Sequence, residues 1–182
     1  MTSGQRLPKG LSPLALFSVT MGGLGLLRPA SGSWGSLPPV ALAFLIVWSG
    51  APWWVLDVSL ALTVVFGTIA CVKFGKLAEE AFGAKDPSSV VADETAGCAV
   101  TLLAVPWWMI ATGDSNALVR TAIVCATGFF FFRLFDVWKP GYVGDLQSQP
   151  HGWGIVLDDL AAGAWAWPPT ILSAVIALHY WA

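Results

Sequence analysis

Apolar residues along this chain gather in runs long enough to cross a lipid bilayer, which takes roughly 20 helical residues, or somewhat fewer for a packed span. Strand-like alternation and repeats of solenoid length are absent. Because lipid offers no partners to backbone N–H and C=O groups, spanning segments are helical. The pattern predicts an all-α, polytopic membrane helical bundle of about four to five transmembrane helices. We expect them over residues 37–52, 54–72, 95–113 and 117–135, with a fifth from Ile155 to the C-terminus that Pro168 and Pro169 interrupt.

A weaker apolar stretch over residues 11–27 precedes these runs. Arg6 and Lys9 stand before it, as the basic region of a signal peptide would, but Arg28 follows directly and no A-x-A cleavage site is present. We therefore predict a short N-terminal amphiphilic or re-entrant helix that the protein retains.

The composition agrees with a membrane protein. Of 182 residues, 56% are apolar and 11% are charged, whereas an ordinary soluble domain carries about 25% charged residues. We predict a single membrane domain over residues 1–182. The formal net charge of −2 lacks the basic excess typical of nucleic-acid binding, so no such partner is expected. Apolar surroundings predict buried thiols at Cys71, Cys98 and Cys125. Interfacial anchoring is expected of Trp53, Trp54, Trp107 and Trp108.

Lysine and arginine residues predict the orientation of the bundle. If the chain starts on the cytoplasmic side and residues 37–52 make the first crossing, eight of the nine Lys and Arg residues share that side, as the positive-inside bias requires. Only Arg120 lies near the opposite face. The eight are Arg6, Lys9, Arg28, Lys73, Lys76, Lys85, Arg133 and Lys139.

Acidic residues collect at the predicted cytoplasmic ends of different helices. Two sites are adjacent pairs that lead directly into apolar helix, where a charge costs roughly 2.5 to 3.5 kcal/mol, so a compensating cation is expected. Each pair has a glycine four residues after one of its acids, which lets another helix approach closely. This D-x-x-x-G spacing predicts two helices packed face to face around an acidic pocket. The acids are Asp86, Asp93, Glu94, Asp136, Asp158 and Asp159, and the glycines are Gly97 and Gly163.

Carboxylates from several helices, without His or Cys, suit Mg²⁺, which prefers hard oxygen ligands together with phosphate. Arg133 and Lys139 stand three residues on either side of Asp136 and could neutralise that phosphate. The glycine-rich G-S-W-G-S at residues 32–36 either offers backbone N–H donors to an anion or is a flexible turn before a membrane helix. The residues alone thus predict a membrane-embedded, magnesium-binding site that faces the cytoplasm, and they name no reaction.

Four blocks stand in order along the chain: G-S-W-G-S (Gly32 to Ser36), D-P-S-S-V-V-A-D-E-T-A-G (Asp86 to Gly97), F-F-R-L-F-D-V-W-K-P (Phe131 to Pro140) and G-I-V-L-D-D-L-A-A-G (Gly154 to Gly163). In this order and spacing they resemble the phosphatidylglycerophosphatase A family. The resemblance implies an all-helical enzyme of the bacterial inner membrane, with its active site facing the cytoplasm. Such an enzyme hydrolyses phosphatidylglycerophosphate to phosphatidylglycerol and inorganic phosphate in a Mg²⁺-dependent reaction.

The residues and the resemblance together give a working mechanism. Asp159, slightly favoured over Asp158, would orient an attacking water, and a covalent aspartyl-phosphate route stays open. Substrate phosphate would be bound by Ser33, Gly35, Ser36, Arg133 and Lys139. The catalytic residues would be Asp93, Glu94, Asp136, Lys139, Asp158 and Asp159, and the metal ligands would be Asp93, Glu94, Asp136, Asp158 and Asp159.

Three departures from the family pattern concern loops and leave the carboxylates intact. Ser33 stands where Thr is usual, the segment after Pro140 is shorter, and His151 is one place out of register, so it is given no role.

Other functions are open at this point. One alternative is a phosphatase acting on another phosphorylated lipid, and another is a small non-enzymatic membrane transporter or ion-binding protein. Cysteine-, double-aspartate- and histidine-based phosphatases are disfavoured, because the chain lacks C-x5-R and D-x-D and has only two histidines. The sequence also leaves open whether two copies form a homodimer.

Overall fold

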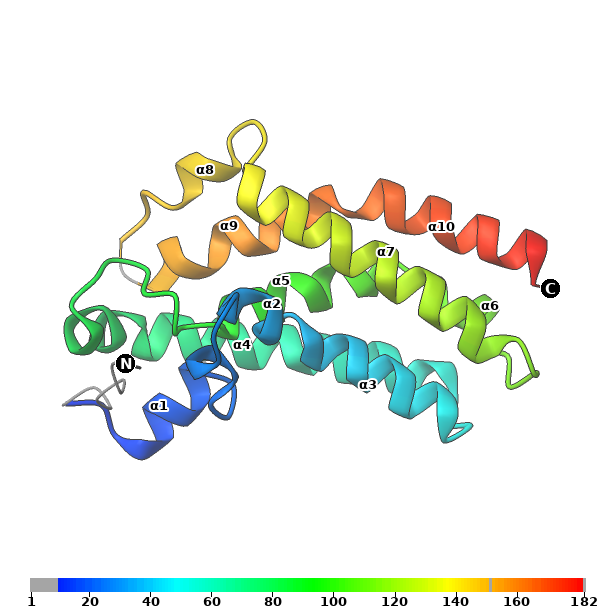
Figure 1. Ribbon diagram of the computed structural model, residues 1–182, viewed down its shortest axis with the longest axis horizontal. Helices are drawn as coiled ribbons and strands as arrows, with labels where there is room; N and C mark the ends of the chain where they lie inside the picture. The colour runs from blue at the N-terminus through cyan, green and yellow to red at the C-terminus, as the bar shows by residue number, and fades with distance from the viewer. Residues whose placement is uncertain (1–9, 151, 182) are drawn as a thin grey trace.

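The computed structural model describes residues 10–150 and 152–181, and within them every regular element is a helix. The long helices lie side by side along the long axis of the molecule (Figure 1). The predicted all-α membrane bundle is confirmed. In the described part of the chain, four helical segments are long and apolar enough to cross a membrane: Ser31–Trp48, which joins α2 (Ser31–Gly35) to α3 (Leu37–Trp48); α4 (Trp53–Phe82); α7 (Ala117–Trp138); and Gly152–Tyr180, which joins α9 (Gly152–Trp165) to α10 (Trp167–Tyr180).

Helix α4 is longer than the run predicted within it at residues 54–72. Its 30 residues rise about 45 Å at about 1.5 Å per residue, whereas the hydrocarbon core of a bilayer is about 30 Å thick. The last third of α4 carries Lys73, Lys76 and two glutamates, so it extends beyond the core. Gly83 ends the helix in the left-handed conformation, with φ of +70°.

The span predicted over residues 95–113 is wrong as one continuous helix. The chain forms α5 (Ala92–Leu103), of only 12 residues, then a turn and the short α6 (Trp107–Ile110). Pro106 lacks a backbone N–H and disfavours helical geometry in the residue before it, which ends the first piece. Most residues of α5 are buried, and it packs against α4 and α9. This passage therefore runs inside the protein.

Tryptophans near the helix ends fall into two groups. Trp53, Trp54 and Trp108 are exposed, as expected of interfacial anchors. Trp107 is fully buried, and its Nε1–H donates to the Leu102 carbonyl at 2.9 Å. The residue four positions after Leu102 is Pro106, which has no N–H to donate to this carbonyl. The prediction that Trp107 anchors the interface is therefore wrong.

Three smaller predictions from the sequence agree with the structure: a short N-terminal helix, a break before α10 and buried cysteines. Residues 11–27 contain a short helix, α1 (Pro13–Val19), followed by a 3-10 turn, η1 (Leu24–Leu26). Helix α1 packs on α4 and leaves Leu14 and Phe17 exposed. The fifth predicted run is interrupted where Pro168 and Pro169 begin α10. All three cysteines are buried and free, as expected.

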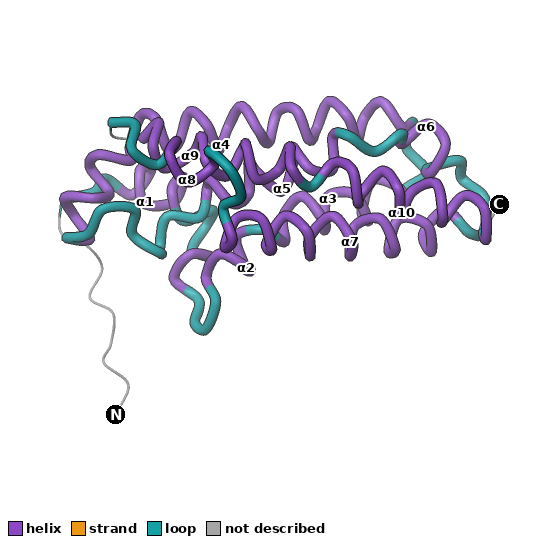
Figure 2. The backbone as a smooth tube through the Cα atoms, turned by 90° about the horizontal axis from the view of Figure 1, so that it is seen from above, coloured by secondary structure: helices purple, strands orange, loops and turns teal. Residues whose placement is uncertain are grey.

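The two ends of the bundle differ in which helices begin or end there. Helices α5 and α9 begin toward the end that also holds α1 and the short α8 (Val143–Leu146), whereas α6 and the end of α10 lie at the other (Figure 1). Figure 2 shows the same order along the long axis. Helix α7 starts beside α6 and runs back, so its last turns approach α5 and α9. The fold thus gathers most of the predicted acidic positions at one end.

Candidate active site

Three carboxylates from two helices meet near the start of α5. Asp93 and Glu94 lie in the first turn of α5, and Asp159 lies within α9. One oxygen from each of the three side chains lies within 4.8 Å of the others. Asp93 and Asp159 are 5% and 4% exposed. The structure therefore brings three of the five predicted metal ligands to one point, which we call the acidic cluster.

Close contact between α5 and α9 holds the acidic cluster together. A Cβ added to Gly97 would lie 2.6 Å from the backbone oxygen of Asp159, and one added to Gly163 would overlap the backbone oxygen of Gly97. Only glycine allows this approach. Thr101 Oγ1 lies 3.2 Å from the carbonyl oxygens of both glycines. The face-to-face packing predicted from the D-x-x-x-G spacing is confirmed.

Arg133 brings a positive charge from α7 to the acidic cluster. Its Nη1 lies 2.5 Å from Asp136 Oδ2 and 3.9 Å from Glu94 Oε1. The first contact follows from the neighbourhood of residues three apart on a helix, and the second joins α7 to α5. The guanidinium thus places a positive charge beside Glu94, one member of the Asp93–Glu94 pair. Asp136 itself is held by this ion pair.

Lys139 provides the corresponding cation for α9. It ends α7 in the left-handed conformation, with φ of +49°, because Pro140 follows and disfavours further helix. Its Nζ lies 2.5 Å from Asp158 Oδ2. Burial disfavours the charged amine, but the hydrogen bond and the nearby carboxylates outweigh burial and raise the pKa of Lys139 above its ordinary value. Lys139 is therefore charged at neutral pH, and Asp158 pairs with it rather than joining the acidic cluster.

Asp86 lies in the loop between α4 and α5, outside the acidic cluster. Gln147 Nε2 donates to Asp86 Oδ2 at 2.9 Å, which ties this loop to the segment between α7 and α9. Burial raises the pKa of Asp86, although the hydrogen bond from Gln147 and the charge of Lys139 oppose part of that effect. Nothing in the sequence marks Gln147 as the partner of Asp86.

Four carboxylate oxygens of the site are buried and have no hydrogen-bond partner among the residues that the structure describes. Leaving a buried polar atom unpaired costs about 1 to 3 kcal/mol, and more for a charged group. Three of the four belong to the acidic cluster, and a divalent cation bound there would supply the missing partner. An all-oxygen donor set of this kind suits Mg²⁺, so the residues present fit the predicted metal. The four atoms are Asp93 Oδ1, Glu94 Oε2, Asp158 Oδ1 and Asp159 Oδ2.

The G-S-W-G-S segment folds as α2 and lies against the acidic cluster. A Cβ added to Gly32 would overlap Glu94 Oε1 and lie 2.8 Å from Arg133 Nη2. Thr95 Oγ1 lies 2.5 Å from the Gly35 carbonyl, which ties α2 to α5. Neither Gly32 nor Thr95 was predicted as a site residue. The place of Gly32 in the glycine-rich block was the one signal that pointed to it.

The structure gives two of the predicted phosphate-binding residues packing roles. Ser36 is fully buried, and its hydroxyl donates to the Gly32 carbonyl at 2.7 Å. Gly35 packs on Val91, whose Cβ lies 2.5 Å from where a Cβ of Gly35 would be. The geometry therefore does not support a phosphate contact by the Ser36 side chain. For the half-buried Ser33 such a contact stays a prediction.

Three residues named from the sequence lie outside the described residues, namely Arg6, Lys9 and His151.

Comparison with known proteins assigns this arrangement to a family. The family model for phosphatidylglycerophosphatase A matches residues 17–174. This chain belongs to the phosphatidylglycerophosphatase A family. The matched range contains the acidic cluster, Asp136, Asp158 and both of the cations that pair with them. The resemblance of the four sequence blocks to the phosphatidylglycerophosphatase A family is confirmed.

Individual relatives agree with the phosphatidylglycerophosphatase A assignment. Phosphatidylglycerophosphatase A of Haemophilus influenzae is 30% identical over 176 residues, which cover 94% of this chain and 91% of the relative. The Escherichia coli protein of the same name is 31% identical over 153 residues, covering 84% and 78%. A Bacteroides thetaiotaomicron protein provisionally named phosphatidylinositol-3-phosphatase is 32% identical over 133 residues, 70% of each chain. No solved structure matches the chain.

Proposed function

We propose that this member of the phosphatidylglycerophosphatase A family hydrolyses phosphatidylglycerophosphate to phosphatidylglycerol and inorganic phosphate. One observation carries the proposal: buried carboxylates from α5 and α9 gather beside cations from the end of α7, at one end of an apolar bundle. A lipid keeps its phosphorylated head group where membrane meets water, so a site at the end of the bundle can reach it. The names of the Haemophilus influenzae and Escherichia coli relatives support this substrate.

We propose Mg²⁺ as the cofactor. Asp93, Glu94 and Asp159 would hold it, because their oxygens cluster and each residue has one oxygen without another partner. Asp136 and Asp158 also stay proposed ligands, although Arg133 and Lys139 pair with them. When bound, Mg²⁺ supplies charge neutralisation and fixes the terminal phosphate beside the carboxylates.

The side chains supply the rest of the reaction. Arg133 and Lys139 place two positive charges beside the carboxylates, where they stabilise negative charge that develops on the phosphate oxygens. Asp159 accepts a proton from the attacking water, or attacks phosphorus itself and forms an aspartyl-phosphate that water then hydrolyses. In both routes the P–O bond to the glycerol head group breaks and the leaving oxygen takes up a proton.

We further propose that the acidic cluster faces the cytoplasm from the bacterial inner membrane. Arg120 lies in the first turn of α7, whereas Arg133 and Lys139 lie at its other end. Lys73 and Lys76 lie in the last third of α4, toward the end of the bundle where α5 begins. The excess of lysine and arginine on the side of the acidic cluster supports this orientation.

A different phosphorylated lipid is the second candidate substrate. The Bacteroides relative is provisionally named for phosphatidylinositol-3-phosphatase activity, and the acidic cluster would engage any lipid phosphomonoester in the same manner. A transporter is less well supported, because a proton or ion relay needs acids spaced through the bilayer, whereas Asp93, Glu94 and Asp159 gather at one point.

Phosphate release by the purified, detergent-solubilised protein separates these candidates. Phosphatidylglycerophosphate and phosphatidylinositol 3-phosphate are each supplied with Mg²⁺ and with a chelator. We expect release from the first lipid, with Mg²⁺ only. Release from the second lipid alone would support the second candidate, no release from either would contradict a lipid phosphatase, and release in the presence of chelator would contradict the cofactor.

Asp159→Asn and Asp93→Asn test the acidic cluster itself. Each change should lower hydrolysis by at least about 100-fold, because a neutral amide binds a divalent cation more weakly than a carboxylate does, and neither should prevent membrane insertion. Glu80→Gln removes a carboxylate that is 63% exposed on α4 and serves as the matched control. Full activity in either aspartate variant would remove that residue from the site.

A further inference from the structure

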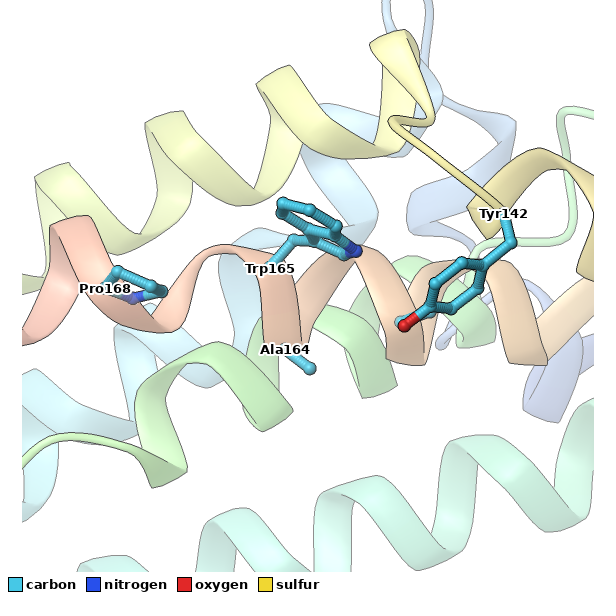
Figure 3. A pocket seen from close by; sticks show the side chains of 5 residues that line it. Tyr142, Ala164, Trp165 and Pro168 are labelled. Atoms are coloured by element: carbon cyan, nitrogen blue, oxygen red, sulfur yellow. The ribbon is translucent and has the colours of Figure 1, made fainter.

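An apolar groove lies on the exposed side of the last turns of α9 and the first turn of α10. Its cavity has a volume of about 250 Å³, and its lining is Tyr142, Ala161, Ala164, Trp165 and Pro168. Figure 3 shows the Tyr142 ring reaching from the loop after α7 over α9, with Trp165 and Pro168 further along. We propose that this groove holds one acyl chain of the phospholipid substrate while its phosphate is at the acidic cluster. This inference rests on the proposed function.

Small and large side chains lie next to one another on the exposed side of this segment. Ala164, Trp165 and Pro168 are exposed, whereas Ala162 and Ala166 are buried. The small alanine side chains and the larger aromatic rings of the lining leave a hollow between them. Gly141 lies close to Trp165, because a Cβ added to Gly141 would lie 3.9 Å from Trp165 Cζ2. The loop after α7 thus borders the groove.

Two residues that line the groove stand close in sequence to the Lys139–Asp158 ion pair. Tyr142 follows Lys139 by three residues, and Ala161 follows Asp158 by three. At about 1.5 Å per residue, Ala161 lies about 4.5 Å and Pro168 about 15 Å further along the helical segment than Asp158. The groove therefore starts about one turn from the acidic residues and leads away from them, along a segment long and apolar enough to span the membrane. A lipid whose phosphate is at the site would extend its tails in this direction.

The dimensions and chemistry favour a single hydrocarbon chain. A volume of about 250 Å³ is smaller than most small-molecule sites, which measure roughly 300 to 1,000 Å³, and an α-helix about 10 Å across would need a wider channel. Lipid tails are as apolar as this lining, so burial adds little affinity. The groove contributes position: it fixes the lipid so that its phosphate meets the carboxylates.

Filling the groove tests this inference. Ala164→Trp should lower kcat/KM for dioleoyl phosphatidylglycerophosphate by roughly 10-fold, since misplacing a substrate slightly can cost up to about 100-fold. The same variant should hydrolyse the deacylated head group at the wild-type rate. Val175→Trp, on an exposed face of α10, is the matched control and should behave as wild type on both substrates.

Each outcome of the kinetic test has a distinct meaning. An equal loss on both substrates, or no loss on the long-chain lipid, would overturn the groove as an acyl-chain site. If the wild-type protein releases no phosphate from phosphatidylglycerophosphate, the proposed function fails, and the groove is then tested by labelling alone.

Labelling provides that independent measurement. A phosphatidylglycerophosphate with a photoreactive group on one acyl chain should attach within residues 161–168 of the wild-type protein, and Ala164→Trp should reduce that attachment. Attachment elsewhere only would contradict the proposal.

Discussion

At the scale of single residues, Lys139 has a backbone conformation that few residues other than glycine adopt, with φ of +49°. The left-handed turn takes the chain out of α7 and leaves the amine against Asp158 on α9. The two side chains are 25% and 2% exposed, so water screens the pair little, and a hydrogen bond between ionised groups is stronger than a neutral one. The contact offsets the conformational cost and positions a cation at the site.

Removing this cation should impair turnover. Lys139→Ala is expected to lower kcat/KM for phosphatidylglycerophosphate roughly 10- to 100-fold, because it removes a charge beside the reacting phosphate and leaves Asp158 buried without a cation. Steady-state phosphate release measures the effect. Lys76→Ala removes a lysine that is 61% exposed on α4 and should keep wild-type kinetics. Unchanged kinetics in Lys139→Ala would cancel the role given to Lys139.

At the scale of elements, α5 contributes most of the acidic cluster, because two of its three carboxylates lie in the first turn of this helix. The helix is short, buried and pressed against α9 through Gly97 and Gly163. A glycine pair of this kind lets the backbones touch, so the distance between the carboxylates of the two helices depends on the absence of two methyl groups.

Adding one methyl group should separate the helices. Gly163→Ala places a Cβ on the Gly97 backbone oxygen and is expected to cost about 1 to 3 kcal/mol of stability, as overpacking does. It should also lower hydrolysis, since α9 moves Asp159 away from α5. Thermal unfolding and phosphate release measure the two effects. Gly144→Ala, where the nearest atom would lie at 3.8 Å, is the control. Wild-type stability in Gly163→Ala would contradict the close packing.

Sequence patterns predicted some of these elements and missed others for physical reasons. Pro168 correctly predicts the break in the last run. The break before Pro106 is not predicted, because apolar residues continue beyond it and hydropathy does not distinguish lipid from protein interior. The meeting of α5 with α9 followed from the D-x-x-x-G spacing. The pairing of Lys139 with Asp158, 19 residues apart, depends on the tertiary fold and has no local signal.

At the scale of the whole molecule, Arg120 links several helices at the end opposite the acidic cluster, where it is the one cation predicted from the sequence. This residue is 2% exposed, and its guanidinium donates to the Ile110 carbonyl at 3.2 Å and to the Trp181 carbonyl at 2.5 Å. It also pairs with Asp114 at 2.6 Å. One side chain thus joins α6, α7 and the end of α10.

Low pH should weaken the ion pair between Arg120 and Asp114. The hydrogen bonds from Arg120 and Thr112 hold the pKa of Asp114 well below its usual range. A lowered pKa in the folded state contributes stability above the ordinary value of about 3.9, and the contribution is lost as the pH falls through the folded-state pKa. Asp114→Asn should therefore lower the Tm at pH about 7, and its difference from wild type should shrink toward pH about 2. A difference that does not vary with pH would contradict the ion pair.

The passage through α5 and α6 makes the number of passes along the bundle odd instead of even. Within residues 10–150 and 152–181, the four long apolar segments alone would be an even number of crossings, which would return the chain to the side of the membrane on which α1 lies. Because α5 and α6 together also run from one end of the bundle to the other, α1 and the tail of α10 lie at opposite ends (Figure 1). A reporter enzyme fused ahead of α1 and the same reporter fused behind Tyr180 would consequently sit in different compartments, although a tally of hydrophobic helices assigns them to the same one.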